Sequence, residues 1–188
     1  LAACIGGGAR GLKAAAASHV LPMGLGLNQS VLTRLLQGDA SHGAPALESL
    51  ILTARDSINF FGTVSLDTRD PLTGRSSLAN LVLGSPAIQG YGDADDVASI
   101  RTASLIWSGA TQAPAAAIEG GPGNGSGRLL IEAETIELGY AANTQPSGQT
   151  DEARLALGFS SVELNASKQI GANPVSYTHL TLPTKRIV

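Results

Sequence analysis

The chain has 188 residues, a formal net charge of -3 and a pI near 5.5. It is rich in glycine, with 23 residues, and only 14% of it is charged and 4% aromatic. A general nucleic-acid binder would be basic, a coiled coil would carry more charge, and a disordered chain would contain less than 43% hydrophobic residues. No apolar run approaches the ~18 residues of a membrane-spanning helix. We therefore expect no nucleic-acid partner and no membrane span, and the composition favours repetitive β structure.

The N-terminal end carries no visible targeting signal. The chain begins with Leu1, and no charged stretch followed by an apolar one marks a signal peptide. We therefore expect an internal piece of a longer protein. A single cysteine, Cys4, excludes an intramolecular disulfide framework.

Residues 1–47 form an Ala-, Gly- and Leu-rich N-terminal segment with weak patterning. One short helix is predicted in it, near residues 30–38. Ser30 can cap its first turn, three leucines share one face, and Gly38 can close its end.

The stretch from Gly6 to Gly11 matches the G-x-G-x-x-G pattern of dinucleotide-binding proteins. Such a site also needs a preceding strand, a following helix and an acidic residue about 20 residues further on. The next acid is Asp39, and no second strand-helix-strand pattern follows. We interpret these glycines as turn residues and expect no cofactor, with nucleotide binding as a weaker alternative.

An eight-residue pattern, apolar-x-small/apolar-x-x-apolar-x-apolar, recurs across residues 48–173. Its copies cover residues 52–60 (with one extra residue), 76–83, 100–107, 131–138 and 157–164.

Alternating apolar residues indicate strands, and the two-residue skip inside the pattern turns a corner that keeps both halves facing one interior. A unit of ~24–31 residues cannot be stable alone, so it must stack on its copies. We therefore predict an all-β fold, a fragment of a parallel, right-handed β-helix or solenoid with one short N-terminal helix. A β-sandwich of short strands is the alternative.

Two further features follow from this pattern. Trp107 falls at an inward position, so we predict that it packs in the core against Leu83 and Leu138. The glycine-rich stretch 120–127 has neither the Lys-Ser/Thr of a phosphate loop nor an aspartate of a calcium repeat, and we interpret it as a solvent loop.

Four short segments together carry a resemblance. They are INFFGTVSL at residues 58–66, LVL and PAIQGY within residues 81–91, GRLLIEA and IELG within residues 127–139, and GFSSVELNA at residues 158–166. Their order resembles the C-terminal region of filamentous haemagglutinin-family exoproteins, which are exported by two-partner secretion. The resemblance covers roughly residues 48–172. It implies a long, secreted, right-handed β-helix at the bacterial cell surface. It also implies an outer-membrane transporter during export and a receptor or glycan on a host or neighbouring cell as partner.

Residues 174–188 differ from everything before them, with no glycine and a basic end. The stretch from Val175 to Val188 resembles the translated read-through of a sequencing adapter. We exclude it from the fold as an artefactual or disordered tail. A genuine edge strand between Thr178 and Thr184 is the alternative.

Groups that could carry chemistry are few. Asp93, Asp95 and Asp96 could hold calcium, but no known loop is complete there, and a solvated turn explains them. The three histidines have no ligand-spaced partners for zinc; they are His19, His42 and His179.

Charged residues within the repeats are further candidates for catalytic groups. Glu132 and Glu134 would lie about 7 Å apart on one strand face, as paired carboxylates of a glycosidase could, with Glu137 nearby. Strand alternation alone explains them. Three arginines near the repeat starts do not align into a basic ladder; they are Arg101, Arg128 and Arg154.

We therefore expect no catalytic, cofactor-binding or metal-binding residues and no enzyme activity. The predicted function is that of a structural segment of a large secreted bacterial surface exoprotein, acting in adhesion or cell contact. The alternative is a fragment of a β-helical polysaccharide lyase or hydrolase. Its site would be Asp93, Asp95 and Asp96 beside Arg101.

Overall fold

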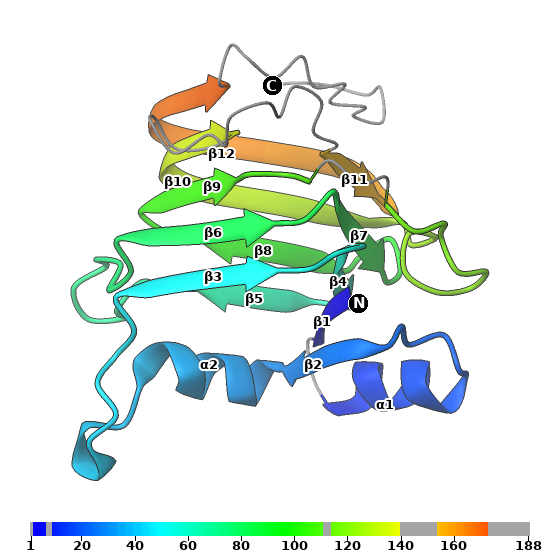
Figure 1. Ribbon diagram of the computed structural model, residues 1–188, viewed down its shortest axis with the longest axis horizontal. Coiled ribbons are helices and arrows are strands. Elements are labelled where there is room, and N and C mark those ends of the chain that lie inside the picture. The colour runs from blue at the N-terminus through cyan, green and yellow to red at the C-terminus, as the bar shows by residue number, and fades with distance from the viewer. Residues whose placement is uncertain (1, 7–8, 111–113, 140–153, 173–188) are drawn as a thin grey trace.

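The computed structural model describes residues 2–6, 9–110, 114–139 and 154–172, which form two parallel sheets and two α-helices (Figure 1). The first sheet has the strand order β11 (Leu155–Leu157), β7 (Ala87–Tyr91), β4 (Ile58–Phe61), β1 (Ala2–Gly6) and β2 (Gly24–Asn28). The second sheet has the order β3 (Ser49–Thr53), β6 (Asn80–Gly84), β9 (Ser104–Trp107), β10 (Gly127–Leu138), β8 (Val97–Arg101) and β5 (Val64–Asp67), and β12 (Phe159–Ala172) also pairs with β10. The helices are α1 (Ala9–Ala17), α2 (Gln29–Gln37) and a 3-10 turn, Ala40–His42.

Strand β10 gives the second sheet its curled shape. Its first half pairs with β8 and its second half with β9, while β12 runs along the other side of both halves (Figure 1). Both β10 and β12 therefore pass through the bend without interruption. The chain passes repeatedly between the two sheets, and side chains from both make one common core.

Apolar side chains on neighbouring strands repeat in register through this core. One column runs through the second halves of the strands and consists of Leu50, Leu81, Leu105 and Ile136; Ile170, which is 48% exposed, continues it on β12 outside the core. Another runs through the first halves and consists of Leu66, Ile100, Ile131 and Leu164. Because parallel strands lie ~4.8 Å apart, each side chain in a column packs directly on the next.

The register confirms part of the predicted repeat. Residues 100–107 lie beside residues 131–138 position for position, and Leu81 and Leu83 continue the same columns. Trp107 is buried between Leu83 and Leu138, as predicted, and its indole N–H donates to the Ser85 carbonyl at 2.9 Å.

The alignment of the first and last predicted copies was wrong. Leu52, the first residue of its copy, pairs with Leu83, which is the last residue of the neighbouring copy. Leu164 pairs with Ile131, and Leu157 belongs to the other sheet, opposite Gln89. Alternation alone leaves such shifts open, because any two apolar positions of the same phase match equally well.

The predicted fold class is also wrong. The chain is mixed α/β, with five- and seven-stranded parallel sheets and a β-α-β-α segment at its N-terminal end, rather than an all-β, right-handed β-helix solenoid with one short helix. The repeat that led to that prediction begins only at residue 52, and the weakly patterned segment before it holds β1, α1 and β2. Strand β1 lies between β2 and β4, so this segment completes the first sheet.

Helix α2 covers the core at the end opposite β12 (Figure 1). Its N-cap is Asn28, whose Oδ1 accepts from the Val31 N–H at 3.0 Å, whereas Ser30 was the predicted cap; Gly38 follows its end. Leu32 and Leu36 are buried in the common core.

The side chain of Gln29, at the start of α2, pairs with the backbone of β5. Its Nε2 donates to the Ser65 carbonyl at 2.6 Å, and its Oε1 accepts from the Ser65 N–H at 3.0 Å. One amide side chain thus replaces a neighbouring strand at this sheet edge, which satisfies groups that an open edge leaves unpaired.

Candidate functional site

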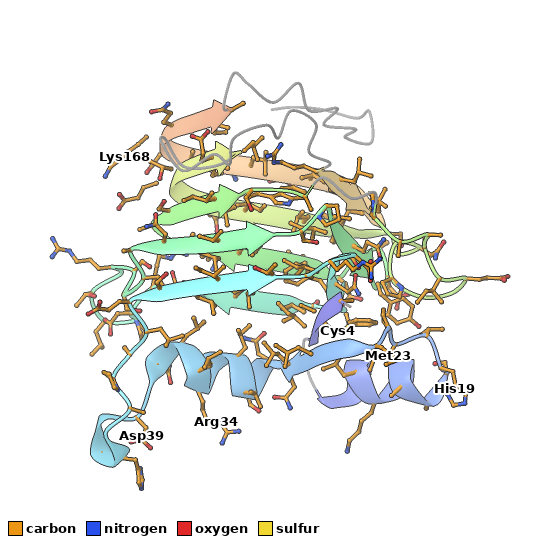
Figure 2. The ribbon with its side chains drawn as sticks, in the orientation of Figure 1. Cys4, His19, Met23, Arg34, Asp39 and Lys168 are labelled. Atoms are coloured by element: carbon orange, nitrogen blue, oxygen red, sulfur yellow. The ribbon has the colours of Figure 1, made fainter. Side chains whose placement is uncertain are left out.

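An open groove of about 570 Å³ follows the bend of the second sheet. It rises from the loop after β5 to the bend of β12, where Lys168 lies in Figure 2. Most of its lining is small or polar, and it consists of Arg69, Gly74, Ser76, Thr102, Ala103, Glu132, Ala133, Glu134, Leu164, Asn165, Ala166, Ser167 and Ile170.

Two carboxylates predicted to share a strand face meet in this groove, and each is paired with a cation. The Arg101 guanidinium lies 2.5 Å from Glu132 Oε2, and Lys168 Nζ lies 2.5 Å from Glu134 Oε2. Both pairs join neighbouring strands. Glu137, the third candidate, does not line the groove.

The ion pairs of Glu132 and Glu134 can be compared with what a glycosidase requires of its two carboxyl groups. A general acid needs surroundings that keep its carboxyl protonated, such as an apolar pocket or a second carboxylate in contact. Glu132 and Glu134 are partly exposed, and each has its own cation instead. The groove therefore carries two carboxylates that are each paired with a cation from a neighbouring strand.

The acidic turn between β7 and β8 uses one of its carboxylates to hold itself together. Asp96 Oδ2 accepts from the Asp93 N–H at 2.8 Å, and Asp96 Oδ1 accepts from the Thr63 hydroxyl at 2.8 Å. Across the described residues, no group of three or more His, Cys, Asp or Glu side chains could hold a metal ion. Arg101 pairs with Glu132 and does not form a joint site with this turn.

A Ser-His-Asp cluster that the sequence analysis missed lies in the loop after α2. Asp39 Oδ2 is 2.8 Å from His42 Nδ1, and the Ser41 hydroxyl donates to Asp39 Oδ1 at 2.5 Å. These hydrogen bonds, that of Ser41 first, lower the pKa of Asp39. The cluster is not a catalytic triad, because Ser41 lies against Nδ1, the nitrogen that faces Asp39, and His42 is 82% exposed. The short spacing of these three residues in the sequence was the signal that could have predicted the cluster.

The glycine motif near the N-terminus has more of a dinucleotide fold around it than predicted. Strand β1 precedes it, α1 follows, and β2 pairs with β1 in parallel. Gly7 and Gly8 themselves lie outside the described residues. Asn28 ends β2, where an acid would bind a ribose, and its side chain caps α2 instead. The chain after α2 enters the other sheet, and no second such unit follows within the residues that the structure describes.

Arg154 has a role that its position in the sequence did not indicate. It is fully buried; its Nε donates to the Trp107 carbonyl at 2.8 Å and its Nη2 to the Ser108 carbonyl at 2.7 Å. It therefore ties the start of β11 to the end of β9. No ladder with Arg101 and Arg128 forms.

Some of the remaining candidate residues lie within the described ranges and others lie outside them. His19 is exposed after α1, where its Nδ1 lies 3.2 Å from the Ala16 carbonyl (Figure 2). His179 and the tail 174–188 lie outside the described residues. Cys4 is a buried free thiol on β1, and its burial raises its pKa.

Neither α-helix could span a membrane, because each of the two found in the described ranges has nine residues, and a span needs about 20. Comparison of the chain with models of protein families, with curated proteins and with solved structures gave no match in any of the three.

Proposed function

We propose that this chain is a non-catalytic structural and contact segment of a large secreted surface exoprotein, similar to those of the filamentous haemagglutinin family. The observation that carries the proposal is the stack of parallel strands with matched apolar columns in one core. Such stacking makes a rigid support whose outer face is free to vary. A support of this kind suits a protein that presents surfaces to other cells.

The groove along the bend supplies a contact surface in this proposal. Its charges are balanced by cross-strand pairs, and its small side chains leave a trough between them. A receptor or glycan on a host or neighbouring cell is the proposed partner, the bacterial cell surface the proposed location, and an outer-membrane transporter the proposed route of export.

Binding of the purified, fluorescently labelled chain to epithelial and bacterial cells tests the proposal. Lys168→Glu places a second carboxylate against Glu134, which lines the groove, and we expect it to weaken cell binding at least fivefold. Arg34→Glu makes the same charge change on α2, at the opposite end of the molecule (Figure 2), and should leave binding unchanged. Absence of saturable binding to either cell type would contradict the contact role.

A turnover assay tests the non-catalytic part. The chain is incubated with neutral and acidic polysaccharides, and released reducing ends and unsaturated products are measured. We expect no release above a boiled control. If the parent chain releases these products and Glu132→Gln or Glu134→Gln abolishes the release, the hydrolase alternative replaces this proposal.

A further inference from the structure

A second cleft, of about 390 Å³, lies at the carboxyl ends of β4 and β7 and shares no residue with the groove. The glycine-rich segment 120–126 forms one wall, and the acidic turn after β7 forms another. Its lining consists of Ala14, Phe61, Gly62, Tyr91, Gly92, Asp93, Asp96, Gly120, Asn124, Gly125 and Ser126.

The glycine-rich segment is a loop with Gly120, Asn124 and Ser126 exposed, as predicted, but its backbone is also hydrogen-bonded to the end of β7 and the residue after it. Gly123 N–H donates to the Gly90 carbonyl at 2.9 Å, and Ser126 N–H donates to the Gly92 carbonyl at 3.0 Å. A Cβ at Gly125 would lie 2.8 Å from the Gly92 nitrogen, so only glycine allows this approach. The cleft wall is thus backbone held in place before any ligand arrives.

Tyr91 provides the aromatic surface of the cleft. Its ring meets Phe61 edge to face, with centroids 5.3 Å apart, which fixes its orientation. It is partly exposed, and its hydroxyl has no hydrogen-bond partner within the described part of the chain. An apolar face with a polar tip suits a ligand that has both C–H surfaces and hydroxyls.

Three polar side chains lie around this ring. The Asp93 carboxylate and the Ser126 hydroxyl have no partner among the described residues, and Asn124 Nδ2 donates to the Ile118 carbonyl, which leaves its Oδ1 as an acceptor. Asp96 acts as a positioning residue, because its bond to the Asp93 N–H shapes the turn that presents Asp93. These groups can exchange hydrogen bonds with adjacent sugar hydroxyls.

The charge of the cleft restricts the ligand further. Two carboxylates line it, and none of the described residues that line it is a lysine, arginine or histidine. An anionic sugar would meet like charge, whereas a neutral or amine-bearing one would not. The volume is at the lower end of ~300–1,000 Å³ found for small-molecule sites, which suits one or two sugar rings.

We infer that this cleft binds a neutral or amino hexose unit, stacked on Tyr91 and hydrogen-bonded by Asp93. The inference names a ligand class for the contact role and rests on that proposed function. For a ligand of this size we expect a Kd on the order of 1 mM. Glucuronate should bind at least tenfold more weakly than glucose.

Saturation-transfer NMR on the full chain tests the inference with glucose, galactose, mannose, N-acetylglucosamine, glucosamine and glucuronate as probes. We expect saturation of at least one neutral or amino sugar. Tyr91→Ala should abolish it, and Asp93→Asn should weaken it at least fivefold. Asp95→Asn removes a neighbouring carboxylate that does not line the cleft, so it should bind like the parent.

The opposite results would overturn the site. Either no neutral or amino probe is saturated, or the saturation survives Tyr91→Ala. A preference for glucuronate would also overturn it. Far-UV circular dichroism of each variant checks the fold. Sugar binding without cell binding would refute the contact role and leave the cleft intact, whereas cell binding without sugar binding would refute the cleft alone.

Discussion

Ile136→Asp tests the packing of the central columns most directly. Ile136 is 1% exposed and lies between Leu105 and Ile170 in register. Losing a buried isoleucine side chain costs about 2–5 kcal/mol. The introduced carboxyl would have to be protonated to remain inside, and at pH 7 that adds about 4 kcal/mol for a group whose usual pKa is about 3.9.

The sum of about 6–9 kcal/mol is comparable to the whole stability of a typical domain, about 5–15 kcal/mol. We therefore expect the variant to be largely unfolded at pH 7. The protonation cost disappears near pH 4, so the gap between variant and parent should narrow there by about 4 kcal/mol.

Urea unfolding followed by the fluorescence of Trp107, the single tryptophan, measures this gap at pH 4, and at pH 7 the loss of the variant's folded baseline gives a lower bound for it. Ile51→Asp is the matched control, because Ile51 is 64% exposed on β3 and should lose less than about 0.5 kcal/mol. The reasoning is refuted if Ile136→Asp unfolds within about 1 kcal/mol of the parent at pH 7. It is equally refuted if the gap is the same at both pH values.

Three further changes probe other parts of the fold. Gln29→Ala leaves the Ser65 backbone groups unpaired and should lower the free energy of unfolding in urea by about 1–3 kcal/mol. A loss below about 0.5 kcal/mol would show that water replaces the amide as the partner of Ser65. Arg154→Met removes the donors to the Trp107 and Ser108 carbonyls and should lower the free energy of unfolding by about 3 kcal/mol in the same assay. An unchanged urea midpoint would mean that the buried guanidinium makes no net contribution to stability. Because burial raises the pKa of Cys4, the folded protein holds the thiol proton more tightly than the unfolded chain does. The resulting stability is present below the usual thiol value of 9.0 and is lost as the pH rises through the raised pKa. Melting temperatures from pH 8 to 10.5 should therefore fall more steeply for the parent than for Cys4→Ala, and parallel curves would contradict this.

The amino-acid sequence by itself determined which side of each central strand is buried. The alternation at Leu81, Leu83, Leu105 and Trp107 placed these side chains inside, and they are inside. It also indicated a helix near residues 30–38, and α2 spans Gln29–Gln37. These features depend on local periodicity, which reports the burial of a face directly.

Only the tertiary structure decided which strands become neighbours. The placement of β1 between β2 and β4, the division of β10 between β8 and β9, and the pairing of Leu164 with Ile131 all depend on contacts far apart in sequence. Both candidate surfaces arise in the same way. Glu134 meets Lys168 across two strands, and the segment near Gly125 meets Gly92 across a loop. A strand's own pattern is satisfied by any apolar neighbour in phase, so the choice among neighbours is made by packing of the whole core.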